Sequence, residues 1–165
     1  MTTKNEIYSR IKSELNLHKL KISGEDFDRP WGGLFKIDDD SLNNFLSIYF
    51  SKITLPFDIK KLTVSPKILV VEPGKKLSWQ SHERRSELWR VVKGPVGIYT
   101  SDDDIQPEEM NVYYDNELIE MKLGTRHRLV GLEDWGIVAE IWIHRFPGNP
   151  SDEEDIRRIE DDFGR

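Results

Sequence analysis

Apolar residues near the start of the chain recur at helical spacing. Ile7, Ile11 and Leu15 lie four positions apart, so they fall on one face of a helix. Thr3 and Glu6 precede this stripe in the arrangement of a capping box, in which each side chain bonds the backbone N–H of the other residue. The pattern therefore predicts an amphipathic helix that begins directly after Thr3.

A second helical pattern follows residue 40, where Asp40 or Ser41 can act as the N-cap. Five apolar positions then repeat at helical spacing: Leu42, Phe45, Leu46, Tyr49 and Phe50. We expect this stripe to pack in the core. Between the two helices, residues 29–33 contain a proline and paired glycines, which favour an irregular loop over a regular element.

From residue 64 onward the pattern changes to short runs of β-branched and apolar residues. The runs end at the turn-forming pairs Pro73–Gly74, Gly94–Pro95 and Pro147–Gly148. Many short strands separated by turns are typical of a β-sandwich or a β-barrel. We therefore expect a mainly β fold over this part of the chain.

The last segment begins with another capping-box pattern, at Ser151 and Glu154, and continues with Ile156, Ile159 and Phe163 on a common helical face. It predicts a short C-terminal helix. The expected organisation is one domain over residues 1–165, with a helical N-terminal extension over 1–60, a β-barrel over 61–147 and a C-terminal helix over 148–165.

Composition narrows the chemistry. The 165 residues include no cysteine, so any metal has to be held by nitrogen and oxygen ligands. A formal net charge of -6 argues against a nucleic-acid partner, because phosphate backbones are bound by clustered Lys and Arg. The first thirty residues are polar and no apolar run is long enough to cross a bilayer, which predicts no membrane partner and a cytoplasmic location.

One spacing indicates a metal site. Gln80 and His82 are two positions apart, so on a strand they project from the same face, and Glu87 can return beside them after a tight turn. His127 follows Gly124 in a later strand, and a barrel brings distant strands together around its interior. Two imidazoles, a carboxylate and an amide oxygen suit one divalent metal, with Zn as first choice and Mn, Co, Ni or Fe as alternatives.

The segment from Gly74 to Gly94, followed by Gly124 and His127, resembles the two motifs of the cupin superfamily. Its sequence, PGKKLSWQSHERRSELWRVVKG, is similar to the cupin domain of type II phosphomannose isomerases, in which a glutamine replaces the first motif histidine. Two further segments agree with that family: RPWGG at residues 29–33 and EEDIRRIEDDFGR at residues 153–165.

The resemblance implies a cupin double-stranded β-helix, which is a jelly-roll barrel, and the interconversion of mannose 6-phosphate and fructose 6-phosphate. It also implies that Arg165 is the catalytic arginine and that the metal ligands are Gln80, His82, Glu87 and His127. Five positions depart from the family. Glu83, Arg84 and Leu88 are at positions where the family usually has histidines, and Lys122 and Gly131 replace the proline and asparagine expected around the second motif.

An isomerase also needs a group outside the ligand set to move a proton between two carbons. Lys76, Lys122 and Glu140 are the candidates for this role. The phosphate of the substrate needs a multi-donor cationic site, for which we select Arg85 and Arg165.

Residues at the barrel mouth are expected to bind the sugar. Arg29 and Trp31 belong to the RPWGG segment, and Lys122 is a further candidate for a substrate contact. Trp31 either stacks against a sugar face or plugs the core. We favour the plug, because a large aromatic beside a proline turn most often anchors a loop.

Three functions are compatible with the sequence. The first is a metal-dependent aldose–ketose isomerase acting on mannose 6-phosphate, fructose 6-phosphate or a related sugar phosphate. The second is a non-catalytic cupin that binds a sugar phosphate or a nucleotide sugar. The third is a different cupin enzyme such as an iron oxygenase, although Gln80 and Arg165 favour the isomerase. The resemblance also raises the expectation of a homodimer formed through sheet edges.

Overall fold

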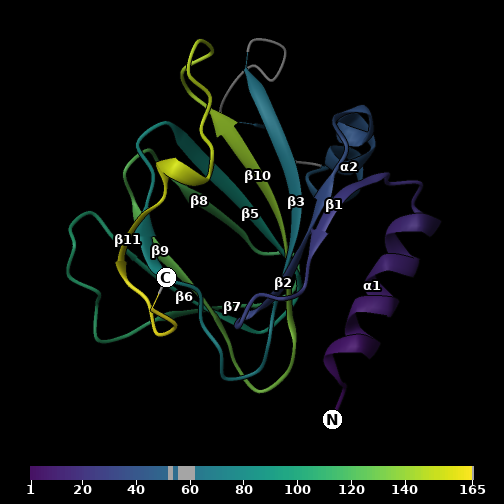
Figure 1. The fold of residues 1–165 in the computed structure, drawn as a ribbon, viewed down its shortest axis with the longest axis horizontal. Helices are drawn as coiled ribbons and strands as arrows, with labels where there is room; N and C mark the ends of the chain where they lie inside the picture. The colour runs from purple at the N-terminus through teal and green to yellow at the C-terminus, as the bar shows by residue number, and fades with distance from the viewer. Residues whose placement is uncertain (52–53, 56–61, 165) are drawn as a thin grey trace.

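The computed structural model describes residues 1–51, 54–55 and 62–164, which form two antiparallel β-sheets with two α-helices beside one of them (Figure 1). The six-stranded sheet has the order β1 (Ile22–Asp26), β2 (Gly32–Ile37), β3 (Thr63–Val71), β10 (Gly136–His144), β5 (Arg85–Lys93) and β8 (Leu118–Met121). The five-stranded sheet has the order β11 (Arg157–Glu160), β4 (Trp79–Ser81), β9 (Arg126–Gly131), β6 (Val96–Ser101) and β7 (Asn111–Tyr113). The helices are α1 (Lys4–Leu17) and α2 (Leu42–Tyr49), with the 3-10 turns η1 (Asp39–Ser41) and η2 (Glu153–Asp155). The mainly β prediction is confirmed.

Successive side chains of the central strands point to opposite faces of the sheet, so the strands contribute to two separate hydrophobic cores. Trp89 of β5 and Val138 of β10 face the interior between the two sheets. Leu88 and Ile141, on the opposite face of the same strands, belong to a second core that includes Phe45 of α2. Because both of its faces are covered, β10 is buried along its whole length.

Both predicted N-terminal helices are present. The capping box of Thr3 and Glu6 is complete, and the three stripe residues of α1 are buried. α2 follows the turn η1, which is capped by Asp38; Ser41, one of the two predicted N-cap residues, is at the N-cap of α2 but makes no side-chain capping bond. No helix in the described ranges has the length and apolar character needed to cross a membrane.

The prediction of an irregular loop at residues 29–33 is wrong for the two glycines. Gly32 and Gly33 begin β2, which pairs with β3 in the register Gly32↔Val71, so the N-terminal extension adds strands to the barrel sheet. Gly32 has φ +142°, and a Cβ at this position would lie 2.0 Å from the carbonyl oxygen of Val70. The glycine therefore permits close approach of two backbones and does not interrupt the strand.

The predicted C-terminal helix is also wrong. Asp152, rather than Ser151, caps the short turn η2, and the chain then extends as β11. β11 pairs with β4 in the register Arg158↔Gln80. β4 would otherwise leave an open sheet edge, and pairing with that edge overrides the local helical spacing of the isoleucines.

Gly32→Ala should destabilise the fold by at least about 2 kcal/mol, because it places a methyl group against a backbone carbonyl and forces a positive φ on alanine. Urea denaturation followed by tryptophan fluorescence measures the free energy of unfolding. Gly148→Ala is the matched control, since nothing lies within 4 Å of its added Cβ, and it should change stability by less than about 0.5 kcal/mol. Equal stability of the two variants would contradict the role given to Gly32.

Candidate metal centre

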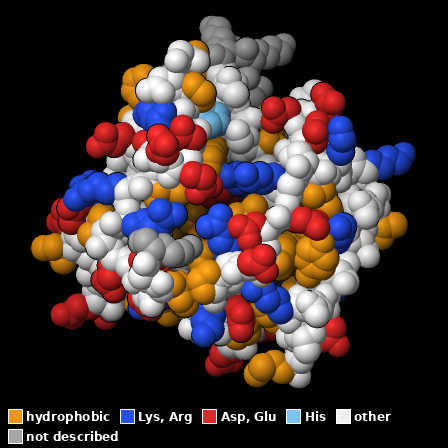
Figure 2. Space-filling model, in the orientation of Figure 1, with side chains coloured by type: hydrophobic (Ala, Val, Ile, Leu, Met, Phe, Trp, Pro, Cys, Tyr) orange, Lys and Arg blue, Asp and Glu red, His pale blue; other side chains and the backbone are white. Residues whose placement is uncertain are grey.

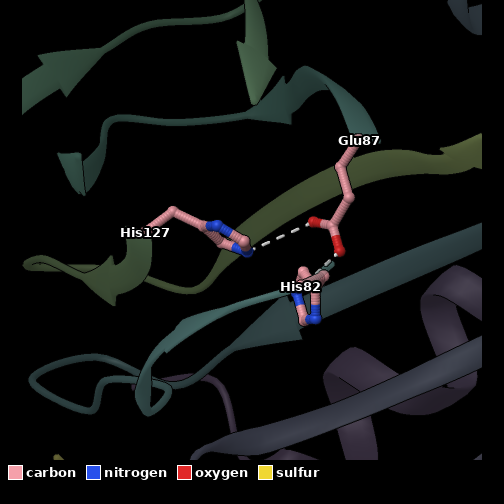
Figure 3. A group of neighbouring side chains, drawn as sticks. All are labelled: His82, Glu87 and His127. Atoms are coloured by element: carbon pink, nitrogen blue, oxygen red, sulfur yellow. Dashed lines mark ion pairs between the residues drawn. The ribbon is translucent and has the colours of Figure 1, made fainter. Parts of the chain in front are cut away.

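Three of the four predicted ligands meet inside the barrel (Figure 3). His82 directly follows β4, Glu87 lies in β5 and His127 lies in β9, so three strands position them. Each offers one ligand atom, and these atoms lie within 4.8 Å of one another. All three side chains are only 2% exposed, so the cluster is shielded from bulk water.

The nitrogen and oxygen atoms of this cluster are arranged to receive a cation. His127 Nδ1 lies 2.9 Å from the carbonyl oxygen of Thr125, which places the proton of the neutral ring on Nδ1. In the neutral form that metal ligation requires, His127 Nε2 directs a lone pair toward Glu87 Oε2, 3.4 Å away, and it has no hydrogen-bond partner among the described residues. Two facing lone pairs repel one another unless a positive charge lies between them. The cluster therefore fits a metal ion.

His82 completes the three-residue cluster from the other side of the carboxylate. Its Nε2 lies 3.1 Å from Glu87 Oε1. Burial lowers the pKa of His82, which favours the neutral ring that a metal ligand requires.

The Glu87 carboxylate is surrounded by hydrogen-bond donors. Arg85 Nε donates to Oε1 at 2.8 Å, and Trp89 Nε1 donates to Oε2 at 3.0 Å. Burial alone would raise the pKa of Glu87, but attraction to the two histidines in their protonated form and to Arg85 outweighs it and holds the pKa well below its usual value. The carboxyl group is therefore ionised at neutral pH, as metal ligation requires.

Gln80 lies beside the cluster, but its amide oxygen has another partner. Gln80 is the cross-strand neighbour of His127, and its Nε2 lies 3.4 Å from His82 Nε2. Its Oε1 accepts a hydrogen bond from Ser78 Oγ at 2.6 Å. Ligation by the amide oxygen would require the amide to rotate and that bond to break, so Gln80 as a fourth ligand stays a prediction.

Each of the three guanidinium nitrogens of Arg85 has a polar partner, two of them in the cluster. In addition to its bond to Glu87, Nη2 lies 3.1 Å from His82 Nε2, and Nη1 donates to Ser151 Oγ at 3.0 Å. Ser151 Oγ donates in turn to Asp155, which also accepts the backbone N–H groups of residues 83 and 84. Arg85 therefore orients the ligand carboxylate, a role that differs from the predicted phosphate contact.

A cleft of about 60 Å³ lies beside the cluster on the face shown in Figure 2, where charged side chains surround a central hollow. Five of the residues predicted for the site line it: Arg29, Trp31, Gln80, Arg85 and Glu140. A larger cleft of about 800 Å³ lies between α1 and β1. His82, Glu87 and His127 line neither cleft, but the small cleft is lined by Gln80 and Arg85, whose side chains contact the cluster, so it is the cleft closer to the cluster.

Glu140 is a buried carboxyl group next to the ligand Glu87. Trp89 Nε1 donates to both carboxylates, at 2.9 Å to Glu140 and 3.0 Å to Glu87. Burial, reinforced by repulsion from Glu87, raises the pKa of Glu140 to about 8. A carboxyl group with this pKa can both accept and release a proton near neutral pH.

The two residues from the RPWGG segment lie at the cleft. Arg29 Nε donates to Asp26 at 2.7 Å, which fixes the side chain. Trp31 is 4% exposed and packs in the interior core while it lines the cleft. Its position agrees with the expected plug and leaves one edge of the ring beside the cleft.

Two other predicted site residues, Lys76 and Lys122, are not among the residues that line the cleft. Lys76 forms an ion pair with Asp162 at 3.2 Å. Lys122 is exposed in the turn after β8. Arg165 lies outside the described residues. The roles assigned to these three side chains stay predictions from the sequence.

Sequence reasoning missed three residues that line the cleft, which are Lys67, Trp142 and Arg158. Lys67 is the cross-strand neighbour of Glu140, and burial lowers its pKa to about 8. The sequence does contain a sign of its role: Lys67 is the only lysine in the largely apolar run of residues 64–71, and a lysine in a buried strand is rare enough to indicate a functional position. Arg158 could not be found, because the predicted helix gave it the wrong neighbours.

The family is decided by comparison with known proteins. The sequence profile of the family described as "Mannose-6-phosphate isomerase C-terminal" matches residues 56–161. The chain belongs to this family. The candidate metal cluster lies within the matched range. So do the residues that line the cleft, except Arg29, Trp31 and Leu34 of the N-terminal extension.

Relatives of this family member include much longer proteins. The chain is 30% identical over 164 residues to "Xanthan biosynthesis protein XanB" of Xanthomonas campestris pv. campestris, and 29% identical over 160 residues to "Mannose-1-phosphate guanylyltransferase" of Escherichia coli strain K12. Each alignment covers 97% of this chain and 27% of the relative. The chain thus spans about a quarter of the length of the curated relatives it matches.

Solved structures share the fold of this family member. CapF from Staphylococcus aureus matches with a TM-score of 0.52 and 17% identity, over 84% of this chain and 34% of that chain. KdgF from Halomonas sp. matches with a TM-score of 0.51 and 14% identity, over 76% of this chain and 89% of that chain. This likeness concerns the fold alone, and it confirms the predicted cupin barrel.

His127→Ala should abolish metal retention, because it removes a ligand nitrogen that has no other partner. Metal content per chain after dialysis, measured by inductively coupled plasma mass spectrometry, should fall at least about tenfold while the far-UV circular dichroism stays unchanged. His18→Ala, at an exposed position, is the matched control and should retain its metal. Unchanged metal content in His127→Ala would refute the site.

Glu140→Gln should stabilise the metal-free protein by a margin that grows with pH. In the wild type, the carboxyl group has a pKa near 4.5 when unfolded and about 8 when folded, so stability is lost as the pH rises between these values. Glutamine cannot ionise, and the variant should gain about 4 kcal/mol relative to wild type at pH 8. Urea denaturation at several pH values tests this, with the exposed Glu120→Gln as control; a pH-independent margin would count against the raised pKa.

Proposed function

We propose that the chain is a metal-dependent aldose–ketose isomerase that interconverts mannose 6-phosphate and fructose 6-phosphate or a related sugar phosphate. The observation that carries the proposal is the buried, protonatable Glu140, which lines the cleft beside a metal-binding cluster. The description of the family agrees with this activity. The names of the relatives, in xanthan biosynthesis and as a mannose-1-phosphate guanylyltransferase, agree with a small sugar phosphate as the substrate.

The reaction moves one proton between adjacent carbons, and Glu140 is the group we assign to it. As a carboxylate it takes the proton from C2 of the aldose, and the electrons of that C–H bond form the double bond of an enediol between C1 and C2. It then returns the proton to C1, while the hydroxyl proton of O2 moves to O1 and the C2 carbonyl forms. Atoms and electrons balance without any co-reactant.

A divalent metal, with Zn as first choice and Mn, Co, Ni or Fe as alternatives, would be held by His82, Glu87 and His127, with Gln80 as the predicted fourth ligand. When bound, it supplies Lewis-acid stabilisation of the negative charge that develops on the sugar oxygens. Arg85 keeps the Glu87 carboxylate in place for this task.

Substrate binding falls to the residues at the rim of the cleft. Arg29 and the edge of Trp31 are placed to contact the sugar. Arg165, by family resemblance, and the lysines Lys76 and Lys122 are further candidates from the sequence.

The departures from the family pattern leave the cluster complete. Leu88 points to the opposite face of β5 and packs in the outer core. The backbone N–H groups of Glu83 and Arg84 donate to Asp155, which holds the C-terminal segment in place. None of these substitutions removes a group that the proposed chemistry uses.

A non-catalytic cupin that binds a sugar phosphate or a nucleotide sugar is the alternative. The anchoring of Arg84 favours it, because Nη1 and Nη2 donate to Asn149 and Asp152 at 2.7 and 2.8 Å and fix a position where the family usually has a histidine. The two functions differ in turnover.

The deciding experiment measures the isomerisation of fructose 6-phosphate by purified protein with added Zn, Mn, Co or Ni. Wild-type protein should turn over with at least one metal, and Glu140→Gln should lower kcat by about 10²- to 10⁴-fold without loss of metal. Glu120→Gln is the control and should keep full activity. Absence of turnover with every metal would contradict the isomerase, and saturable binding of the sugar phosphate without turnover would favour the alternative.

A further inference from the structure

The cleft beside Glu140 has an excess of basic side chains. Four basic and two acidic residues line it: Arg29, Lys67, Arg85, Arg158, Glu140 and Glu153. Two of the four basic groups already have carboxylate partners, since Arg29 bonds Asp26 and Arg85 bonds Glu87. The other two, Lys67 and Arg158, are those whose charges are available to a ligand.

Lys67 carries a buried ammonium group that forms no direct ion pair with a described residue, and attraction to its cross-strand neighbour Glu140 acts on it from a greater distance. Its side chain is in β3, the residue is 5% exposed, and Nζ lies 2.9 Å from the centroid of the Trp142 ring. Within the described residues, no carboxylate lies within ion-pair distance of Nζ. An aromatic face offsets only part of the cost of burying this charge, so an incoming anion would be strongly favoured.

Arg158 is on the opposite sheet, in β11. Its backbone pairs with Gln80, which places it next to the metal cluster and across the cleft from β3. Its Nε is buried and has no hydrogen-bond partner among the residues that the structure describes. A guanidinium with an unused, inward N–H is suited to bind an anion.

Lys67 also faces a second cleft. Lys67, Trp142 and Glu153 line both the small cleft and a neighbouring cleft of about 330 Å³. The second volume is in the range of small-molecule sites, whereas the 60 Å³ of the small cleft is not. A ligand in either cleft would therefore lie beside Lys67.

We propose that Lys67 and Arg158 form a binding subsite for the phosphoryl group of the substrate, one from each sheet. The inference rests on the proposed function, in which C1 and C2 of the sugar lie at the metal cluster. The phosphoryl group of a hexose 6-phosphate is at the opposite end of the sugar. β3 is separated from the β5 strand of Glu87 by β10, so Lys67 starts about 10 Å from the cluster strand, on the side where that end would lie.

Both side chains match the chemistry of a phosphoryl dianion. Lysine acts as a compact point charge, and arginine provides a fork of N–H donors. The lowered pKa of Lys67 has desolvation as its main cause, and a bound dianion would oppose that effect. Binding at this subsite would leave Arg85 free to keep its position on Glu87.

The test compares Lys67→Met and Arg158→Gln with wild type, using fructose 6-phosphate, fructose and inorganic phosphate as probes. Each variant should raise KM for fructose 6-phosphate at least about tenfold with a much smaller change in kcat, and should weaken competitive inhibition by inorganic phosphate. Affinity for fructose, measured by titration calorimetry, and metal content should stay unchanged. Lys93→Met, which removes a lysine paired with Asp134 outside the cleft, is the matched control.

The outcomes separate this inference from the proposed function. Unchanged KM and phosphate inhibition in both variants, with normal wild-type turnover, would overturn the subsite and leave the isomerase in place. Wild-type protein without turnover, but with phosphate binding that both substitutions weaken, would refute the isomerase and support the subsite. Wild-type protein that binds neither fructose 6-phosphate nor phosphate would overturn both.

Discussion

The structure depends on how one buried carboxylate, that of Glu87, is kept ionised inside a β-barrel. An uncompensated charge at 2% exposure would be too costly for a small domain to bear. The barrel offsets part of the cost with donors from Arg85 and Trp89, and a cation held between the carboxylate and the two histidines would offset the rest. All these groups converge because β4, β5 and β9 lie around one interior. The same arrangement leaves His127 Nε2 without a hydrogen-bond partner among the described residues, and on this we base the proposal that the cluster holds a metal instead of forming a closed ion-pair network.

The C-terminal segment is part of this compensation. Ser151 and Asp155 connect Arg85 to the backbone of the turn after His82, so the position of the guanidinium depends on residues that are far away in the sequence. β11 then closes the edge of β4 and brings Arg158 next to Gln80. The segment therefore fixes a residue that orients the ligands and also supplies a cation to the cleft.

Much of this arrangement could be predicted from the sequence, and the failures have physical reasons. The spacing of Gln80, His82 and Glu87 was informative because strand periodicity puts alternate side chains on one face. The paired glycines at residues 32 and 33 wrongly predicted a loop, because they pair with β3. The isoleucine spacing near the C-terminus wrongly predicted a helix, because β11 pairs with β4, and this tertiary pairing overrides local propensity. The hydrogen bonds of Arg85 could not be predicted, because they include a contact with Ser151, which is far away in the sequence and belongs to no local pattern.

The central claim is that the carboxylate of Glu87 and the nitrogens of His82 and His127 hold a divalent metal. Anomalous difference density from crystals grown with zinc or cobalt tests it most directly. The account predicts one strong peak within about 2.0–2.3 Å of His127 Nε2 and a Glu87 oxygen. A metal peak at another histidine, or none at this cluster in crystals of metal-loaded protein, would contradict it.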